Sequence, residues 1–236
     1  RKTMGKVKIK RKSTLIDMTA MSDVTVLLLT FFMLTSTFLQ KEPVTVLTPS
    51  SVSEIKVPVT NTTTVLISPE GKVFLSVSGD ADSTYSSEKV RAELIQTAVA
   101  EYNKTHSKQV QLTKEQVNKF SKMNMFGIRI ADLPAFLDLP QTKQDEVLSD
   151  MNNPSTGIPI DDNKDLNKPN EFQIWMRAIY NSSNPNLETS IKSGEGIAVK
   201  ADKDTPYTTV HNVLDNLQTL KMNKFSLLTA LKTEND

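Results

Sequence analysis

The chain has 236 residues, no cysteine and a formal net charge of +1, with 38% hydrophobic and 6% aromatic residues. This length allows one or two domains, and the lack of cysteine excludes disulfide scaffolds, zinc–thiolate sites and thiol catalysis. Seven basic side chains and no acid lie within residues 1–12, so the remainder is mildly acidic. A nucleic-acid-binding arm is one explanation of the basic block. An apolar segment beside it is a sufficient alternative explanation, because basic residues flank membrane spans on the cytoplasmic side. No nucleic-acid partner is therefore expected.

An apolar segment follows this tail, with no charged residue from 24 to 39 and Asp23 at its start. A bilayer core needs about 20 predominantly apolar helical residues, so we expect a single transmembrane helix over residues 20–39. Basic residues mark the cytoplasmic side, which predicts a cytoplasmic N-terminus and an exported remainder. Residues 35–40 contain no A-x-A-like site, so we expect an uncleaved anchor and not a signal peptide.

Asp23 is the candidate functional residue of this helix. An ionisable group inside a membrane segment is costly and is by default a functional hypothesis. A protonated carboxyl group is tolerated in apolar surroundings, whereas the ionised form seeks water or a polar partner. Protonation therefore changes the surroundings that the helix prefers, and one charge crossing about 100 mV is worth roughly 2.3 kcal/mol. The alternative is a purely structural role.

Four residues, Leu27, Thr30, Leu34 and Thr37, continue from Asp23 along one side of the predicted helix. Their alternating spacing of four and three is that of a packed helical stripe. Hydroxyls mixed with leucines predict a helix enclosed by protein and not only by lipid. The alternative is that the threonine hydroxyls bond back to carbonyls of their own helix.

Beyond residue 39 we expect an α+β domain, in which a small mixed sheet carries helices on one face. β-branched runs at 62–67 and 72–77 predict a hairpin, and further strands are expected at 196–200 and 224–231. Apolar residues at helical spacing predict helices that cover 86–103, 114–126, 132–139, 142–151, 171–180 and 206–220. Thr113 with Gln116 forms a capping-box pattern, Asn170 is an expected N-cap, and Trp175 is expected in the core.

These patterns divide the chain into six parts. They are a basic cytoplasmic tail (1–19), the transmembrane helix (20–39), an extended linker and strand (40–58), the first part of the exported α+β domain (59–104), a helical insertion (105–170) and the second part of that domain (171–236).

Two blocks together resemble the ExbD/TolR family of inner-membrane energy-transducing proteins. Residues 16–33 are similar to its membrane signature, in which an Asp-Val pair precedes a leucine-rich helix. Residues 197–203 are similar to its C-terminal strand and Ala-Asp-Lys turn, and the matching helix follows. The chain departs from the pattern at Ala20, where proline is common, and residues 105–170 have no counterpart in short members.

This resemblance implies a motor subunit of the bacterial inner membrane, neither an enzyme nor a cofactor-binding protein. The family's membrane helices form a homodimer inside a ring of an ExbB/TolQ-like partner, and Asp23 matches the proton-carrying position. The exported domains then act on a TonB-like protein that spans the periplasm and energises outer-membrane nutrient uptake. The alternative within the family is a TolR-like envelope-integrity protein that binds peptidoglycan and couples to a TolA-like partner. A single-pass anchor with a simple binding module is a third hypothesis, and Asp23 counts against it.

Two further segments contain candidate binding residues. Glu54, Ile55, Lys56, Val57 and Pro58 form a predicted strand that can pair with a partner strand through backbone hydrogen bonds, although an ordinary edge strand is equally compatible with the pattern. His211 and Asp215 are expected to form a surface pair, and no metal site is expected because no third ligand stands nearby.

Overall fold

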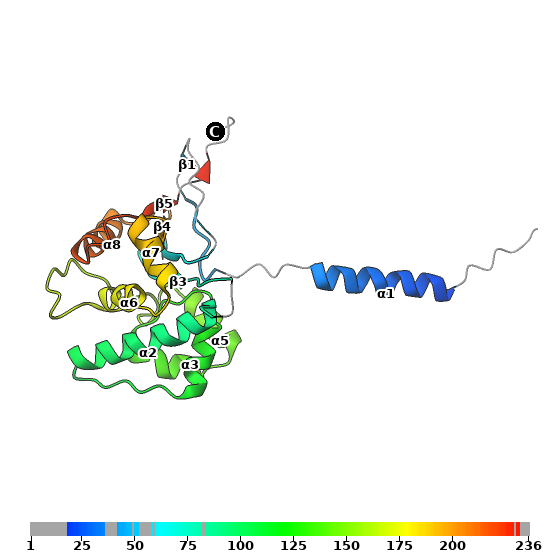
Figure 1. Ribbon diagram of the computed structural model, residues 1–236, viewed down its shortest axis with the longest axis horizontal. Coiled ribbons are helices and arrows are strands. Elements are labelled where there is room, and N and C mark those ends of the chain that lie inside the picture. The colour runs from blue at the N-terminus through cyan, green and yellow to red at the C-terminus, as the bar shows by residue number, and fades with distance from the viewer. Residues whose placement is uncertain are drawn as a thin grey trace, which may run out of the picture. The chain divides into compact units, whose positions relative to one another are not determined.

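The computed structural model describes residues 18–35, 42–48, 50–51, 58, 60–81, 84–228 and 230–231. The chain divides into two compact units, residues 1–41 and residues 42–236 (Figure 1). The first unit contains α1 and the second contains every other described element.

The described residues of the first unit form one helix, α1 (Met18–Thr35). Its large apolar side chains are all exposed on the chain itself, from 52% for Leu28 to 87% for Leu34. Within the described residues, no helix reaches the combination of length and apolarity that a membrane crossing requires. The predicted span continues to residue 39, and residues 36–41 lie outside the described part of the chain.

The second unit is built on a four-stranded mixed sheet in the order β3-β2-β4-β5. Its strands are β2 (Thr63–Ile67), β3 (Val73–Val77), β4 (Ile197–Ala201) and β5 (Ser226–Leu228). β2 and β3 form the predicted antiparallel hairpin, whereas β4 lies parallel to both β2 and β5. The predicted α+β class with a mixed sheet is therefore confirmed.

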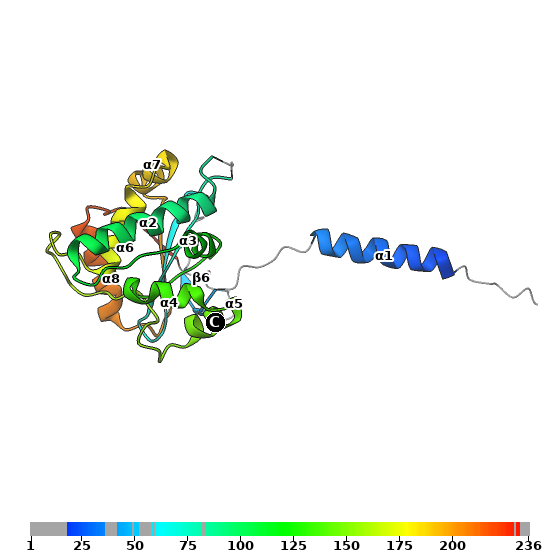
Figure 2. The same cartoon turned by 90° about the horizontal axis from the view of Figure 1, so that it is seen from below.

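Helices make up most of the rest of this unit. They are α2 (Ser87–Thr105), α3 (Lys114–Ser121), the short 3-10 helix η1 (Ile130–Asp132), α4 (Leu133–Asp138), α5 (Gln141–Ser149), α6 (Glu171–Tyr180), α7 (Pro185–Ser193) and α8 (Tyr207–Thr219). The predicted capping box at Thr113 is present, and Asn170, predicted as an N-cap, forms a capping box with Gln173. α2 and α6 lie side by side against the sheet (Figures 1 and 2).

The sheet is buried on both faces. Val65, Val73 and Val199 point to one face and are at most 1% exposed. Leu66 and Phe74 point to the other face and are fully buried as well. Gly127 contacts the ring of Phe74 on that second face, so residues outside the sheet cover it there.

Residues 105–170, predicted as an insertion, extend the sheet at β3. Phe126 and Leu75 exchange two backbone hydrogen bonds of 2.8 Å, and the Ile158 N–H donates to the Val73 carbonyl at 2.8 Å. The same segment supplies Phe120 and Phe126, whose rings lie 5.8 and 4.7 Å from that of Trp175. Trp175 is fully buried, as predicted, at the centre of this aromatic cluster.

The C-terminal strand predicted over 224–231 forms two short strands. β5 continues the main sheet, and β6 (Ala230–Leu231) pairs in parallel with β1 (Ser50–Ser51) from the predicted linker. Residues 50–51 of the linker are therefore joined to the C-terminal end of the same unit, far along the chain.

Candidate functional site

Asp23 lies in the second turn of α1 and is the only ionisable residue of that helix. It is exposed on the chain itself, as are the apolar side chains around it. A helix that is apolar on every side is normally covered by lipid or by other protein. Asp23 therefore lies on a helix surface that we expect lipid or another protein to cover.

Three residues of the predicted stripe lie in the described part of α1. Leu27, Thr30 and Leu34 continue from Asp23 within α1, and Thr37 lies outside the described residues. The Thr30 hydroxyl donates to the Leu27 carbonyl at 2.9 Å, and Thr25 donates to the Met21 carbonyl at 2.8 Å. Both hydroxyls thus donate to carbonyls of their own helix, which is the alternative to a protein-facing stripe given above.

The Ala-Asp-Lys segment after β4 forms a turn that holds the linker. Asp202 is 7% exposed, and its carboxylate accepts hydrogen bonds from the backbone N–H groups of Leu47 and Asp204, at 2.5 and 2.9 Å. The Lys203 N–H donates in turn to the Leu47 carbonyl at 2.9 Å. Leu47 is therefore bound through both of its backbone polar groups.

A second contact joins the linker to β4. Lys200 Nζ lies 2.9 Å from a carboxylate oxygen of Glu42, and both side chains are partly exposed. Lys200 is on the same face of the sheet as Leu66, so the linker approaches that second face. We call residues Glu42, Leu47, Lys200 and Asp202 the linker clamp.

The predicted partner-binding strand falls mostly outside the described residues, which include only Pro58 of its five positions. Pro58 is exposed, and its carbonyl accepts a hydrogen bond of 2.9 Å from the Thr62 hydroxyl. That contact joins the end of the segment to the start of β2.

His211 and Asp215 form the predicted surface pair on α8, with a nitrogen–oxygen distance of 3.3 Å. The exposed Tyr207 ring lies 5.6 Å from the His211 ring. Among the described residues, no group of three or more histidine or acidic side chains could hold a metal ion.

Two ionisable residues, the buried Arg91 and the half-buried Glu171, were not indicated by the sequence. Arg91 on α2 is 6% exposed, and it donates to the carbonyls of Val77 and Ser121 at 3.0 and 3.2 Å and also to that of Met123. Burial lowers the Arg91 pKa, while nearby Glu88 raises it. Only the fold brings these carbonyls together, so no pattern along the chain indicates them.

Glu171 opens α6, and one of its carboxylate oxygens accepts a hydrogen bond of 2.7 Å from the backbone N–H of Ile130. Burial raises the Glu171 pKa, and Asp132 raises it further, whereas the Ile130 hydrogen bond and the charge of Arg129 lower it. Burial has the largest effect. This carboxylate joins α6 to the start of η1.

Comparison with known proteins gives one match. A family model described as biopolymer transport protein ExbD/TolR matches residues 10–124, from the basic tail to just beyond α3. Proteins of this family are transport components and not enzymes. No curated protein and no solved structure matches the chain.

Proposed function

Since residues 10–124 place the chain in the ExbD/TolR family of biopolymer transport proteins, we propose that it is an ExbD-like subunit of a proton-driven motor in the bacterial inner membrane. The observation that carries this proposal is the single carboxylate of α1, Asp23, among exposed apolar side chains. Asp23 is the proton-carrying residue, and the motor energises a TonB-like protein for outer-membrane nutrient uptake.

The proposed span covers residues 20–39, with the basic tail in the cytoplasm and the 42–236 unit in the periplasm. The positive charge of residues 1–12 supports this orientation, because basic residues are retained on the cytoplasmic side. In an apolar environment the carboxyl group of Asp23 is tolerated when protonated, and its ionised form requires a polar partner. Each proton transfer therefore changes the preferred position of the helix.

Three partners complete the motor. A ring-forming protein of the ExbB/TolQ type covers the apolar surface of α1, and a second copy of this chain supplies the other helix of a homodimer. The TonB-like protein receives the work in the periplasm. The matched family supports these partners, and the uncovered apolar side chains of α1 support the first two.

The decisive experiment replaces Asp23 by Asn, which keeps the shape of the side chain and removes its charge. We expect normal membrane insertion and copurification with the ring-forming partner, together with loss of proton-dependent uptake in a strain that lacks the native chain. Asp17→Asn is the matched control, because Asp17 lies six residues earlier beside the basic tail. Wild-type uptake by Asp23→Asn would refute the proton role.

A TolR-like role in envelope integrity, with peptidoglycan binding and a TolA-like partner, is the alternative within the family. Copurification separates the two, because a TonB-like partner supports the first role and a TolA-like partner the second. Crosslinking from a cysteine introduced at Ile55 also tests the proposed partner-binding strand. The absence of a crosslink to any periplasmic partner, in energised and de-energised cells alike, would count against that strand.

A further inference from the structure

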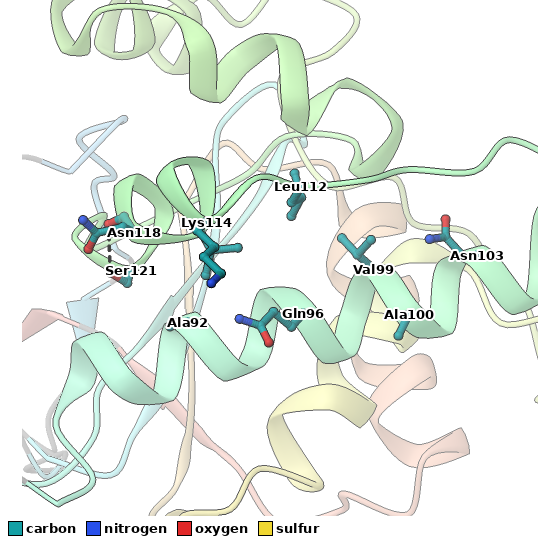
Figure 3. Close-up of a pocket in the computed structure, with 10 residues that line it drawn as sticks. Ala92, Gln96, Val99, Ala100, Asn103, Leu112, Lys114, Asn118 and Ser121 are labelled. Carbon is teal, nitrogen blue, oxygen red and sulfur yellow. Dashed lines mark hydrogen bonds between the residues drawn. The ribbon is translucent and has the colours of Figure 1, made fainter.

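A groove between α2 and α3 lies in the 42–236 unit, and none of the residues that line it belongs to the linker clamp. Its volume is about 730 Å³, within the usual range of small-molecule sites. Ten residues line it: Ala92, Gln96, Val99, Ala100, Asn103, Leu112, Lys114, Val117, Asn118 and Ser121. Figure 3 shows Val99 and Leu112 facing each other across the groove, with Asn103 at one end and Asn118 at the other.

The walls of the groove are fixed by hydrogen bonds. The Asn103 side chain donates to the Val110 carbonyl and accepts from the Val110 N–H, both at 2.8 Å. The Gln109 side chain adds a hydrogen bond of 2.9 Å to the Asn103 carbonyl. Together with the capping box at Thr113, these bonds hold the segment between α2 and α3 in place. The groove is thus formed before any ligand binds.

The residues that line the groove carry positive charge and no negative charge. Lys114 is the only charged residue among the ten that line it, and no carboxylate is included. In Figure 3, Lys114 extends from α3 toward α2, where Gln96 projects into the same space. Within the described part of the chain, neither side chain has a hydrogen-bond or ion-pair partner, so both keep their polar groups available for a ligand.

The remaining wall is mainly apolar. Val99, Leu112 and Val117 provide branched side chains, and Ala92 and Ala100 leave room beside them. A mostly apolar pocket with a few polar groups at one place orients a ligand that has an apolar body and one polar end. The lone cation selects a negative charge at that end, because an ammonium attracts a carboxylate and repels another cation.

We propose that this groove binds a medium-chain carboxylate. The carboxylate lies between Lys114 Nζ and the Gln96 amide, and the alkyl chain lies along Val99 and Leu112 toward Asn103. In Figure 3, Asn103 lies at one end of the groove and Asn118, in the last turn of α3, lies at the other, and the distance between them limits the length of the chain that can lie along the groove.

Because the chain contains no cysteine, an Ala92→Cys variant places a single thiol inside the groove. We expect sodium octanoate to slow maleimide alkylation of that thiol at least fivefold, saturably, in the full chain held in lipid nanodiscs. Ala135→Cys is the matched control, since Ala135 is exposed on α4 and does not line the groove. Equal protection of both thiols would overturn the proposal, as would no protection of either.

The chemistry of the ligand is tested by competitors and variants. Octyltrimethylammonium and 1-octanol are expected to protect at least tenfold more weakly than octanoate, and equal protection by either would overturn the assignment of charge. Lys114→Gln and Ala100→Phe, added to Ala92→Cys, should each weaken octanoate protection about tenfold, while Lys108→Gln and Ala135→Phe leave it unchanged. Protection by a synthetic acidic amphipathic helix and not by octanoate would identify a protein-docking groove instead and overturn the proposal.

Discussion

The carboxylate of Asp202 accepts a hydrogen bond of 2.5 Å from the backbone N–H of Leu47, a residue 155 positions earlier. This bond and the returning Lys203–Leu47 bond join the linker to the turn after β4. The linker is consequently a structured part of the 42–236 unit at this point, although its composition resembles that of an extended connector.

We expect Asp202→Ala to release the linker at Leu47. The variant leaves the N–H groups of Leu47 and Asp204 without their acceptor. Both residues are exposed, so water can replace the carboxylate, and the loss is about 1 kcal/mol for each bond. Hydrogen exchange at the Leu47 amide should accelerate markedly, and the unit should unfold at a lower urea concentration. Asp204→Ala, at the exposed neighbouring position, is the control. Unchanged exchange at Leu47 in Asp202→Ala would show that the clamp does not hold the linker.

Arg91→Met is expected to destabilise the unit by more than about 2 kcal/mol. The guanidinium of Arg91 joins the end of β3 to the C-terminal end of α3, and its loss leaves several buried carbonyls without donors. Urea unfolding followed by the fluorescence of Trp175, the single tryptophan, measures the change. Lys108→Met, on an exposed loop, should stay within about 0.5 kcal/mol of the parent. Equal stability of the two variants would contradict this account of Arg91.

Glu171 makes stability depend on pH. Burial raises its pKa in the folded chain, so the folded state binds this proton more tightly than the unfolded state does. Its contribution to stability is therefore full below the ordinary glutamate pKa and is lost as the pH rises through the raised value. Glu171→Gln keeps an acceptor for the Ile130 N–H and cannot ionise, so its stability should fall less between about pH 4 and pH 8.

The readout for Glu171 is the slope of the unfolding free energy against pH, again followed through Trp175. Glu115→Gln, in the exposed first turn of α3, should keep the parent slope. If Glu171→Gln kept that slope as well, the proposed effect of burying the Glu171 carboxylate would be wrong.

Gly127→Ala should destabilise the contact between the 105–170 segment and the sheet. A Cβ at this position would lie 2.3 Å from a ring carbon of Phe74, which is itself fully buried. Overpacking of this kind costs about 1–3 kcal/mol. Phe74→Leu removes the clashing ring edge, so the double variant should be more stable than the sum of the two single changes predicts. Strict additivity would show that the chain relieves the clash elsewhere.

Local patterns predicted most elements of the 42–236 unit. The β-branched runs predicted the hairpin, the reciprocal bonds at Thr113 matched the expected capping box, and Asn170 is the expected N-cap of α6. α7 was missed because its buried apolar residues are only Leu187 and Ile191. Asn184 before Pro185, with Gly194 after the helix, is the signal that would have found it, since these are its N-cap, first residue and C-cap.

The contacts that organise the site were less accessible to prediction. The proton-carrying candidate Asp23 was evident because a lone acid in an apolar run is conspicuous along the chain. The Leu47–Asp202 and Arg91 contacts join residues far apart in the sequence, so only the folded chain brings their partners together. The same holds for the α2–α3 groove, whose walls share no motif.

The linker clamp also determines how a pull on the chain at residue 42 reaches the sheet. Tension first loads the Glu42–Lys200 ion pair, which is attached to β4. It then loads the Leu47–Asp202 bond just after that strand and the two-residue pairing of β1 with β6, and it reaches β2 last. These attachments are loaded one after another and not together, so each can yield at a small force. The linker therefore lengthens in steps as its contacts release one by one, and the hydrophobic core around β2 stays folded while it does so.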